Sequence, residues 1–190
     1  MELLNRDKRD GYIYDPIIKG VDSNYWSQIA GTITVASNKL RFNAATGASF
    51  LLHEFVDQLD FIVNVPVKPT SGDSRRFGLY SPAGSSQQGA IYFDITDTAF
   101  TVVVIDSFGQ SQTLTLTWDD TNWTAKDILF RIKWEPDIVQ FWVDGSILGT
   151  FSTTSSASIP FVGLPIYIKN GNADNMDITY VAVRRAAGIV

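Results

Sequence analysis

Six aromatic and polar side chains stand at alternate positions of segments that have the pattern of β-strands. At such positions side chains point away from the core, so rings would lie beside hydrogen-bond donors and acceptors on the surface of a sheet. Sugars present apolar C–H faces and hydroxyl edges, and this combination of side chains suits them. We predict a glycan-binding platform on one sheet face. Its residues are Tyr80, Tyr92, Arg131, Lys133, Gln140 and Trp142.

Trp142 is the most informative member of this set, because Phe141 and Val143 already supply the core side chains of the same strand. A structural role competes with glycan binding. The ring would then cover a sheet edge, lie under the N-terminal segment or sit in a subunit interface, where aromatic residues are enriched. The pattern favours this structural role over the binding role.

Calcium binding is the second chemistry that the residue types allow, since it needs only oxygen ligands. Residues 170–177 are dense in carboxylates and amides, and Asn172, Asp174 and Asp177 are the predicted ligands. Residues 119–122 form a second segment of this kind. The favoured alternative is a pair of solvated turns, in which Asn and Asp bond to the nearby backbone. We predict no other cofactor.

Several other chemistries are excluded. The chain has no Cys and one His, so thiolate and His-cluster metal sites are ruled out. His53 stands beside Glu54 without a nucleophile motif, which indicates an ordinary residue at the end of a strand. The net charge of −5 and the alternation within Arg75–Arg76 and Arg184–Arg185 leave no basic patch. We therefore expect no binding to nucleic acid.

The elements that must position these residues have a period of two from Val21 onward. Residues 127–134 illustrate it, with Ile128, Phe130, Ile132 and Trp134 on one face. The Asp-Gly pair at 144–145 predicts a two-residue hairpin. The predicted strands cover residues 32–35, 39–43, 48–53, 60–67, 75–80, 90–95, 100–105, 112–118, 127–134, 138–143, 147–152, 164–169 and 176–185. Together they predict an all-β fold, a two-sheet antiparallel β-sandwich of the jelly-roll kind.

The domain division follows from the first residues, which differ from the rest. Residues 1–20 are charged and then interrupted by Pro16, so we interpret them as an N-terminal arm that packs on its own sandwich or docks to a neighbouring subunit. Residues 21–190 form the sandwich. The start of the chain lacks the apolar core of a signal peptide. No stretch is long and apolar enough to predict a membrane span.

Three groups of segments resemble the concanavalin A-like lectin/glucanase superfamily, whose jelly rolls include LamG-like domains. The clearest is residues 130–145, a strand, a Pro-Asp turn, a strand and an Asp-Gly hairpin. Residues 24–26, 31–35 and 40–42 resemble the opening strands of such domains. Residues 164–172 and 178–185 resemble the closing strands of related domains in phage particle proteins. The resemblance implies the concanavalin A-like jelly roll, a fold that hosts lectins, hydrolases, adhesion modules and viral structural parts.

The resemblance also implies where catalytic residues would stand. Glucanases of this superfamily place carboxylates at alternate positions of one strand, in a Glu-x-Asp-x-x-Glu type of pattern that is absent from this chain. The segment from Asp57 to Asp60 offers no Glu partner and is interpreted as a loop leading into a strand. Asp94 shares its strand face with Tyr92 and Thr96 and has no second acid beside it. Since glycoside hydrolysis normally uses two carboxylates, we predict no catalytic residue and no enzyme.

The function that these observations predict is that of a non-enzymatic virion structural protein. It would be a capsid decoration, minor capsid or tail- or fibre-associated protein of a bacteriophage, made in the host cytoplasm and located in the virion. Its partners would be other particle proteins or further copies of itself, reached through the N-terminal arm, with host-surface glycans as an additional ligand. The alternative is a stand-alone carbohydrate-binding lectin module, and a glycoside hydrolase is the least favoured reading.

Overall fold

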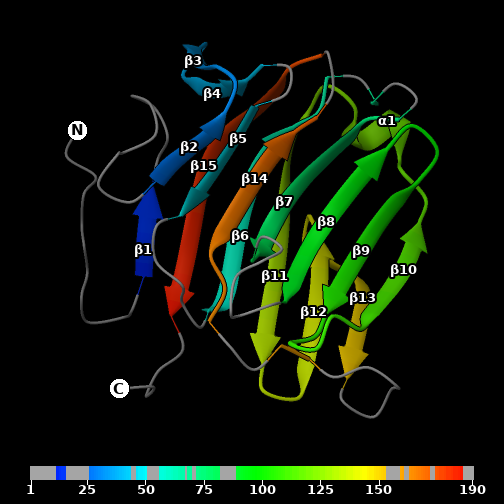
Figure 1. Cartoon of the computed structure of the whole chain (residues 1–190). Coiled ribbons are helices and arrows are strands. Elements are labelled where there is room, and N and C mark those ends of the chain that lie inside the picture. Colours follow the sequence, from blue (N-terminus) through cyan, green and yellow to red (C-terminus); the bar gives the residue numbers. More distant parts are fainter. Residues whose placement is uncertain are drawn as a thin grey trace.

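Two antiparallel β-sheets packed face to face make up the part of the chain that the computed structural model describes (Figure 1). The described residues are 12–15, 26–43, 46–50, 56–66, 68–69, 72–81, 89–152, 159–160, 163–171 and 174–185. They include one short helix, α1 (Asp120–Trp123). No helix among them is long and apolar enough to cross a membrane. The prediction of an all-β, jelly-roll sandwich is confirmed.

Sheet A consists, in spatial order, of β13 (Ser146–Ser152), β12 (Ile138–Val143), β11 (Asp127–Glu135), β6 (Val56–Asn64), β15 (Met176–Arg185), β4 (Lys39–Phe42) and β3 (Ile33–Ala36), with β1 (Tyr12–Asp15) also paired to β15. Sheet B consists of β10 (Ser111–Leu116), β9 (Phe100–Ile105), β8 (Ala90–Thr96), β7 (Ser74–Tyr80), β14 (Ile166–Asn170), β5 (Thr46–Phe50) and β2 (Trp26–Ala30). Each sheet therefore pairs strands that are far apart in sequence, and β14 lies between β7 and β5.

The tight turns follow from the residues at their centres. Asp144 and Gly145 both have positive φ, at 46° and 82°, which is the backbone of a type I′ turn and matches the twist of the flanking strands. Ser37 and Asn38 have the same signs between β3 and β4. The predicted Asp-Gly hairpin is thus confirmed.

Several elements differ from the sequence interpretation, including the strands β1 and β2 and the helix α1, which were not predicted. The segment from Asp57 to Asp60 belongs to β6, which begins at Val56, and is not a loop. Its pairing with both β11 and β15 provides the hydrogen bonds that a loop would lack. Of the predicted arm, residues 1–11 and 16–20 lie outside the described residues, while β1 pairs along β15 of the same chain.

The core between the sheets is built largely from phenylalanine rings of both layers. Phe77 and Phe93 of sheet B contact Phe130 of sheet A with ring centroids 4.9 and 5.2 Å apart and nearly perpendicular planes. Phe93 also meets Phe141 of sheet A at 5.1 Å. Such edge-to-face pairs each contribute about 0.5–1.5 kcal/mol beyond the burial of their area. Because Phe93 is locked inward, its neighbours Tyr92 and Asp94 must point outward from sheet B.

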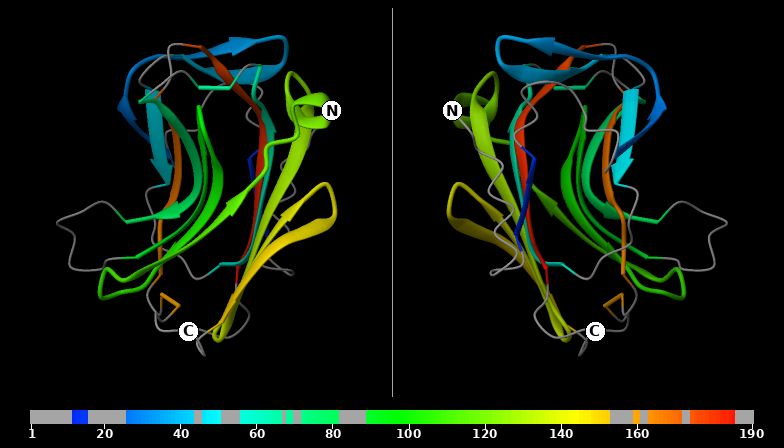
Figure 2. Two further views of the ribbon diagram at one scale, coloured as in Figure 1. Left: turned by 90° about the vertical axis from the view of Figure 1, so that its right-hand side faces the viewer. Right: turned by 90° about the vertical axis from the view of Figure 1, so that its left-hand side faces the viewer.

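Sheet B is bent, and its hollow side faces away from sheet A, as the two side views in Figure 2 show. We call this outward side of sheet B the concave face. Any residue of β7, β8, β9 or β14 that alternates with a core residue reaches this face.

Candidate functional site

The six predicted ligand-binding residues do not share one surface. Tyr80 and Tyr92 stand on β7 and β8 and belong to the concave face of sheet B. The other four predicted residues belong to β11 and β12 and lie on the outer face of sheet A, on the opposite side of the sandwich. They are Arg131, Lys133, Gln140 and Trp142. The grouping on one face is therefore wrong, although every one of the six alternates with core residues as predicted.

The outer face of sheet A is occupied by paired charges. Arg131 donates from Nε and Nη2 to the two carboxylate oxygens of Asp60, at 2.7 and 2.8 Å. The Lys133 ammonium lies 4.6 Å from the centre of the Trp142 ring, a cation–π contact that covers this ring. The indole Nε1 of Trp142 is buried without a hydrogen-bond partner. A glycan-binding role for this group stays a prediction.

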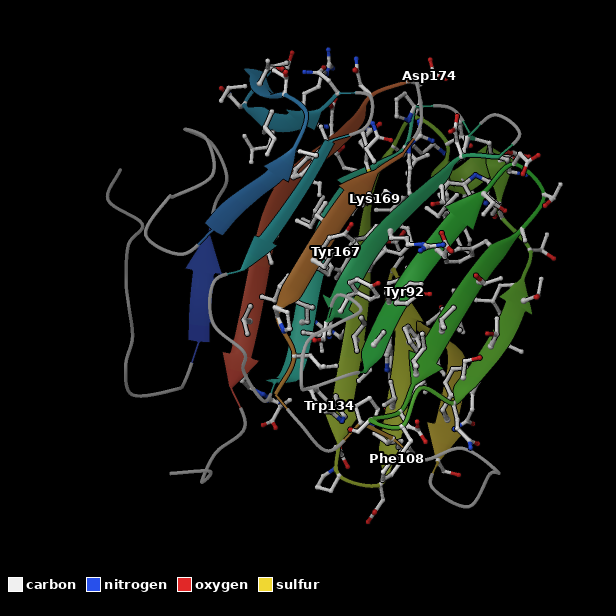
Figure 3. The ribbon with its side chains drawn as sticks, in the orientation of Figure 1. Tyr92, Phe108, Trp134, Tyr167, Lys169 and Asp174 are labelled. Carbon is white, nitrogen blue, oxygen red and sulfur yellow. The ribbon has the colours of Figure 1, made fainter. Side chains whose placement is uncertain are left out.

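The concave face carries two rows of side chains that run across the strands. The first is polar, since Lys169 on β14 pairs with Arg76 on β7, Arg76 with Asp94 on β8, and Asp94 with Thr101 on β9. The second, two residues further along each strand, is mainly aromatic and apolar. Its members are Tyr167, Gly78, Tyr92 and Val103. Tyr92, Tyr167 and Lys169 are labelled on the near sheet in Figure 3.

Asp94 is the carboxylate at the centre of the polar row. Its residue is 7% exposed, and its Oδ2 accepts a hydrogen bond from Arg76 Nε at 3.0 Å. The other oxygen, Oδ1, is buried and has no hydrogen-bond partner. Burial raises the pKa of Asp94 above its usual value, although the nearby charges of Arg76 and Lys169 act in the opposite direction. The site thus holds a carboxyl group that has one oxygen without a hydrogen-bond donor and that stays protonated to a higher pH than an exposed aspartate.

Three tyrosines gather beside this carboxyl. The ring centres of Tyr80 and Tyr167 are 5.1 Å apart, and those of Tyr80 and Tyr92 are 6.3 Å apart. The guanidinium carbon of Arg76 lies 5.5 Å from the centre of the Tyr92 ring, so Arg76 links the aromatic row to Asp94. Burial raises the pKa of both Tyr92 and Tyr167, which keeps their hydroxyls protonated as donors.

Gly78 is buried in the aromatic row between Tyr92 and Tyr167. A Cβ at this position would collide with the Ile91 carbonyl oxygen and lie 2.6 and 2.8 Å from Tyr92 Cα and Cβ. Only a residue without a side chain lets β7 and β8 approach this closely. The close pairing of β7 with β8 thus places Gly78 between Tyr92 on one side and Tyr167 on the other.

The sequence interpretation missed Arg76, Tyr167 and Lys169 as members of this site and set Asp94 aside. A signal was present, since each of these residues alternates with a core residue in a recognised strand. What the sequence did not contain was the pairing of β14 with β7, which brings Lys169 beside Arg76. His53 and Glu54 lie outside the described residues.

The predicted calcium ligands are engaged with protein groups where they are described. Both oxygens of Asp177 accept hydrogen bonds from Arg41, at 2.8 Å each. The backbone carbonyl of Asp174 accepts from Asn170 Nδ2 at 2.8 Å, and Asn172 lies outside the described residues. Among the residues that the structure describes, no three His, Cys, Asp or Glu side chains cluster as metal ligands. Calcium at this segment stays a prediction.

The second segment considered for calcium has a structural role. Asp119 caps the amino end of α1, where its Oδ1 accepts from the Asn122 backbone N–H at 2.9 Å and its Oδ2 from Asn122 Nδ2 at 2.8 Å. These hydrogen bonds lower the pKa of Asp119. Residues 119–122 thus form the capped beginning of a short helix and not the solvated turn that was favoured, and calcium binding at this segment stays a prediction.

Comparison with known proteins identifies the fold. No protein-family model matches the chain, and no curated protein matches its sequence. Among solved structures, an apo Crh5 transglycosylase matches with a TM-score of 0.72 and 12% identity, over 93% of this chain and 85% of that chain. The catalytic domain of an endo-1,3-β-glucanase (laminarinase) from Thermotoga petrophila RKU-1 matches at 0.70 and 14%, over 93% and 97%. A β-glucanase from Bacillus licheniformis matches at 0.70 and 14%, over 93% and 99%.

These matches show that the chain has the jelly-roll β-sandwich fold of these enzymes, which is the fold that the sequence resemblance predicted. They contradict the prediction of a non-enzymatic virion structural protein, because the matched structures are β-glucanases and a transglycosylase. The resemblance of the closing strands to phage particle proteins gains no support from them. At 12–14% identity the similarity shows the fold alone, so any chemistry of this protein must be argued from the residues of its concave face.

Proposed function

We propose that this protein is a carbohydrate-active protein of the glycoside hydrolase type, which binds a polysaccharide across its concave face and acts on its glycosidic bonds through Asp94. The observation that carries the proposal is the buried Asp94 carboxyl, which has one oxygen without a partner, follows Lys169 and Arg76 in the polar row and lies beside the aromatic row. The β-glucanase and transglycosylase names of the structures that share this fold support the same class of substrate.

Binding would use the aromatic row and catalysis the polar row. The ring of Tyr167 in this row and the adjacent ring of Tyr80 offer apolar surface to the C–H faces of sugars, while their hydroxyls and the Arg76 guanidinium offer donors to sugar oxygens. The rows run across the strands, so a bound chain would cross β14, β7 and β8 and bring one glycosidic oxygen to Asp94.

In the proposed reaction Asp94 first donates a proton and later accepts one. The protonated Asp94 carboxyl donates its proton to the glycosidic oxygen as the bond between this oxygen and the anomeric carbon breaks. The resulting carboxylate, held by Arg76, then takes a proton from a water molecule or sugar hydroxyl whose oxygen bonds to the anomeric carbon. Water gives hydrolysis and a sugar hydroxyl gives transfer, and in both cases Asp94 is restored. The raised pKa of Asp94 suits it to the first step.

Asp94 performs both proton transfers in this scheme for a structural reason. Among the outward positions that the structure describes on β7, β8, β9, β10 and β14, it is the single carboxylate. Glycosidases normally divide these two roles between a pair of carboxylates. We therefore expect slow turnover compared with an enzyme that carries the pair.

The test is the release of reducing ends from laminarin, lichenan, alginate and polygalacturonate, together with transfer to a labelled oligosaccharide acceptor. We expect the wild type to act on at least one polymer and Asp94→Asn to lose this activity. Asp60→Asn is the matched control, since Asp60 is 6% exposed and also paired with an arginine, but on the outer face of sheet A. Absence of cleavage, transfer and binding with every polymer would refute the proposal, as would full activity of Asp94→Asn.

A further inference from the structure

The charged residues of the concave face indicate which class of glycan it takes. Its described outward strand positions carry two cations, Lys169 and Arg76, and one carboxylate, Asp94, which gives a local net charge of +1. The whole chain has a net charge of −5. The face therefore differs in sign from the molecule that carries it.

The two cations are not equivalent. Arg76 is committed to Asp94 through the 3.0 Å hydrogen bond and to the Tyr92 ring. Lys169 is half-buried, and its ammonium makes no hydrogen bond or ion pair with the residues that the structure describes. Its positive charge still acts on Asp94, whose pKa it helps to lower against the effect of burial. Among the residues that the structure describes, Lys169 is thus a cation of the concave face without a hydrogen-bond or ion-pair partner.

The position of Lys169 fixes what this ligand must contain. It stands two strands from Asp94 along the polar row, which at a strand spacing of about 4.8 Å corresponds to roughly 10 Å. It also stands two residues from Tyr167 on the same strand, so its side chain emerges on the same side of β14 as the ring. Its Cε lies 3.7 Å from the position that a Cβ would take on Gly171, so the side chain extends toward the carboxyl-terminal end of β14. A group that pairs with the ammonium would therefore lie on this side of a sugar that rests on Tyr167. We infer that the glycan is anionic, with a carboxylate or sulfate group that pairs with Lys169 on a sugar beside the one acted on by Asp94. This inference rests on the proposed function.

The cations on the outer face of sheet A have partners within the protein. On the outer face of sheet A, Arg131 is paired with Asp60, Arg41 with Asp177, and Lys133 lies against the Trp142 ring. An anionic polymer would have to displace these contacts to bind there. Among the described cations of sheet A, Arg184 on β15 is the most weakly paired, since its Nε lies 3.8 Å from an Asp57 oxygen and makes no hydrogen bond. It still has a carboxylate within ion-pair distance, whereas no such pair is found for Lys169 among the residues that the structure describes.

The experiment compares polymers that share one backbone. Laminarin, laminarin oxidised to the uronate at C6 and laminarin carrying sulfate esters would each be titrated into the full chain by isothermal titration calorimetry. We expect at least one anionic form to bind with a Kd about 1.5-fold to fivefold lower than that of neutral laminarin, which is the range for one partly exposed charge pair. The preference should shrink as salt is raised from about 50 mM to about 500 mM. The two anionic arms distinguish a carboxylate from a sulfate ligand.

Two matched variants assign the preference to the site. Lys169→Gln should bind neutral and anionic laminarin alike, whereas Lys133→Gln, on the outer face of sheet A, should keep the wild-type preference. Equal affinity of the wild type for all three polymers would overturn the inference and leave the proposed function standing. The inference also fails if Lys169→Gln keeps the preference. Absence of binding to every form, together with no action on any polymer, would refute the proposed function and the inference with it.

Discussion

Replacing Gly78 by alanine should destabilise the sandwich directly beneath the site. The added Cβ would collide with the backbone of β8, where it would meet the Ile91 carbonyl oxygen and lie 2.6 Å from Tyr92 Cα. These backbone atoms cannot move away unless β7 and β8 separate. Overpacking of this kind costs about 1–3 kcal/mol. The backbone, at φ +154°, adds roughly 1–3 kcal/mol for a residue with a side chain. We expect a total loss of about 3–5 kcal/mol.

Gly145→Ala supplies the matched control. Gly145 also has positive φ, at +82°, but a Cβ there would have open space around it. The control therefore isolates the backbone term, about 1–2 kcal/mol. Both substitutions reduce the entropy of the unfolded chain to the same extent, so this effect cancels in their difference. Gly78→Ala should be the less stable variant by about 2 kcal/mol or more.

Urea unfolding followed by tryptophan fluorescence measures this difference. With an m-value of about 2 kcal/mol/M, the Gly78→Ala midpoint should lie about 1 M below that of Gly145→Ala. Where Gly78→Ala still folds, it should also bind glycans more weakly, because Tyr92 shifts. Equal midpoints for the two variants would show that β7 and β8 are not as closely apposed as described, and the geometry of the aromatic row would then be wrong.

Three further results are expected. The pKa of Asp94 is raised in the folded state, so between the unfolded and folded pKa values the folded protein binds more protons than the unfolded chain, and it loses stability as pH rises through this range. Urea unfolding should therefore show Asp94→Asn gaining stability relative to the wild type as pH increases. A stability difference that does not change with pH would contradict the raised pKa. Asn170→Ala should lower the free energy of unfolding by about 3 kcal/mol or more, since it removes a buried partner of Arg75, and a loss under about 1 kcal/mol would contradict this role. Millimolar calcium should leave the melting temperature unchanged, because Asp177 is already paired with Arg41. An increase in melting temperature that the substitution Asp174→Asn abolishes would instead establish the calcium site.

The sequence predicted most of the fold because alternation and turn chemistry are local. Phe130 and Ile132 repeat at the period of a strand, and Asp144 with Gly145 selects one turn geometry. The buried arginine was not foreseen. Arg75 is fully buried and hydrogen-bonded to Asn170, and burial lowers its pKa to about 10. Alternation with Phe77 and Leu79 places it on the inner face of β7, but only the pairing of β14 with β7 reveals the Asn170 partner that a buried arginine needs.

The site was less accessible to sequence reasoning because it depends on how strands are ordered. Alternation assigns a side chain to the inside or the outside of a strand, and this rule is the same for both sheets. Tyr92 and Trp142 were both predicted to face outward, yet they lie on opposite sides of the molecule. Asp94 was judged by the acids on its own strand, whereas its properties come from burial and from Arg76 on the next strand.

The most direct test of the concave face as the glycan site is a map of where a glycan binds. An isotope-labelled sample would be titrated with laminarin oligosaccharides, neutral and oxidised at C6, while backbone amide chemical shifts are recorded. We predict that the largest changes fall on β7, β8 and β14, around Asp94, Tyr92 and Tyr167. Changes confined to β11 and β12, around Lys133 and Trp142, would place the site on the outer face of sheet A and contradict the account.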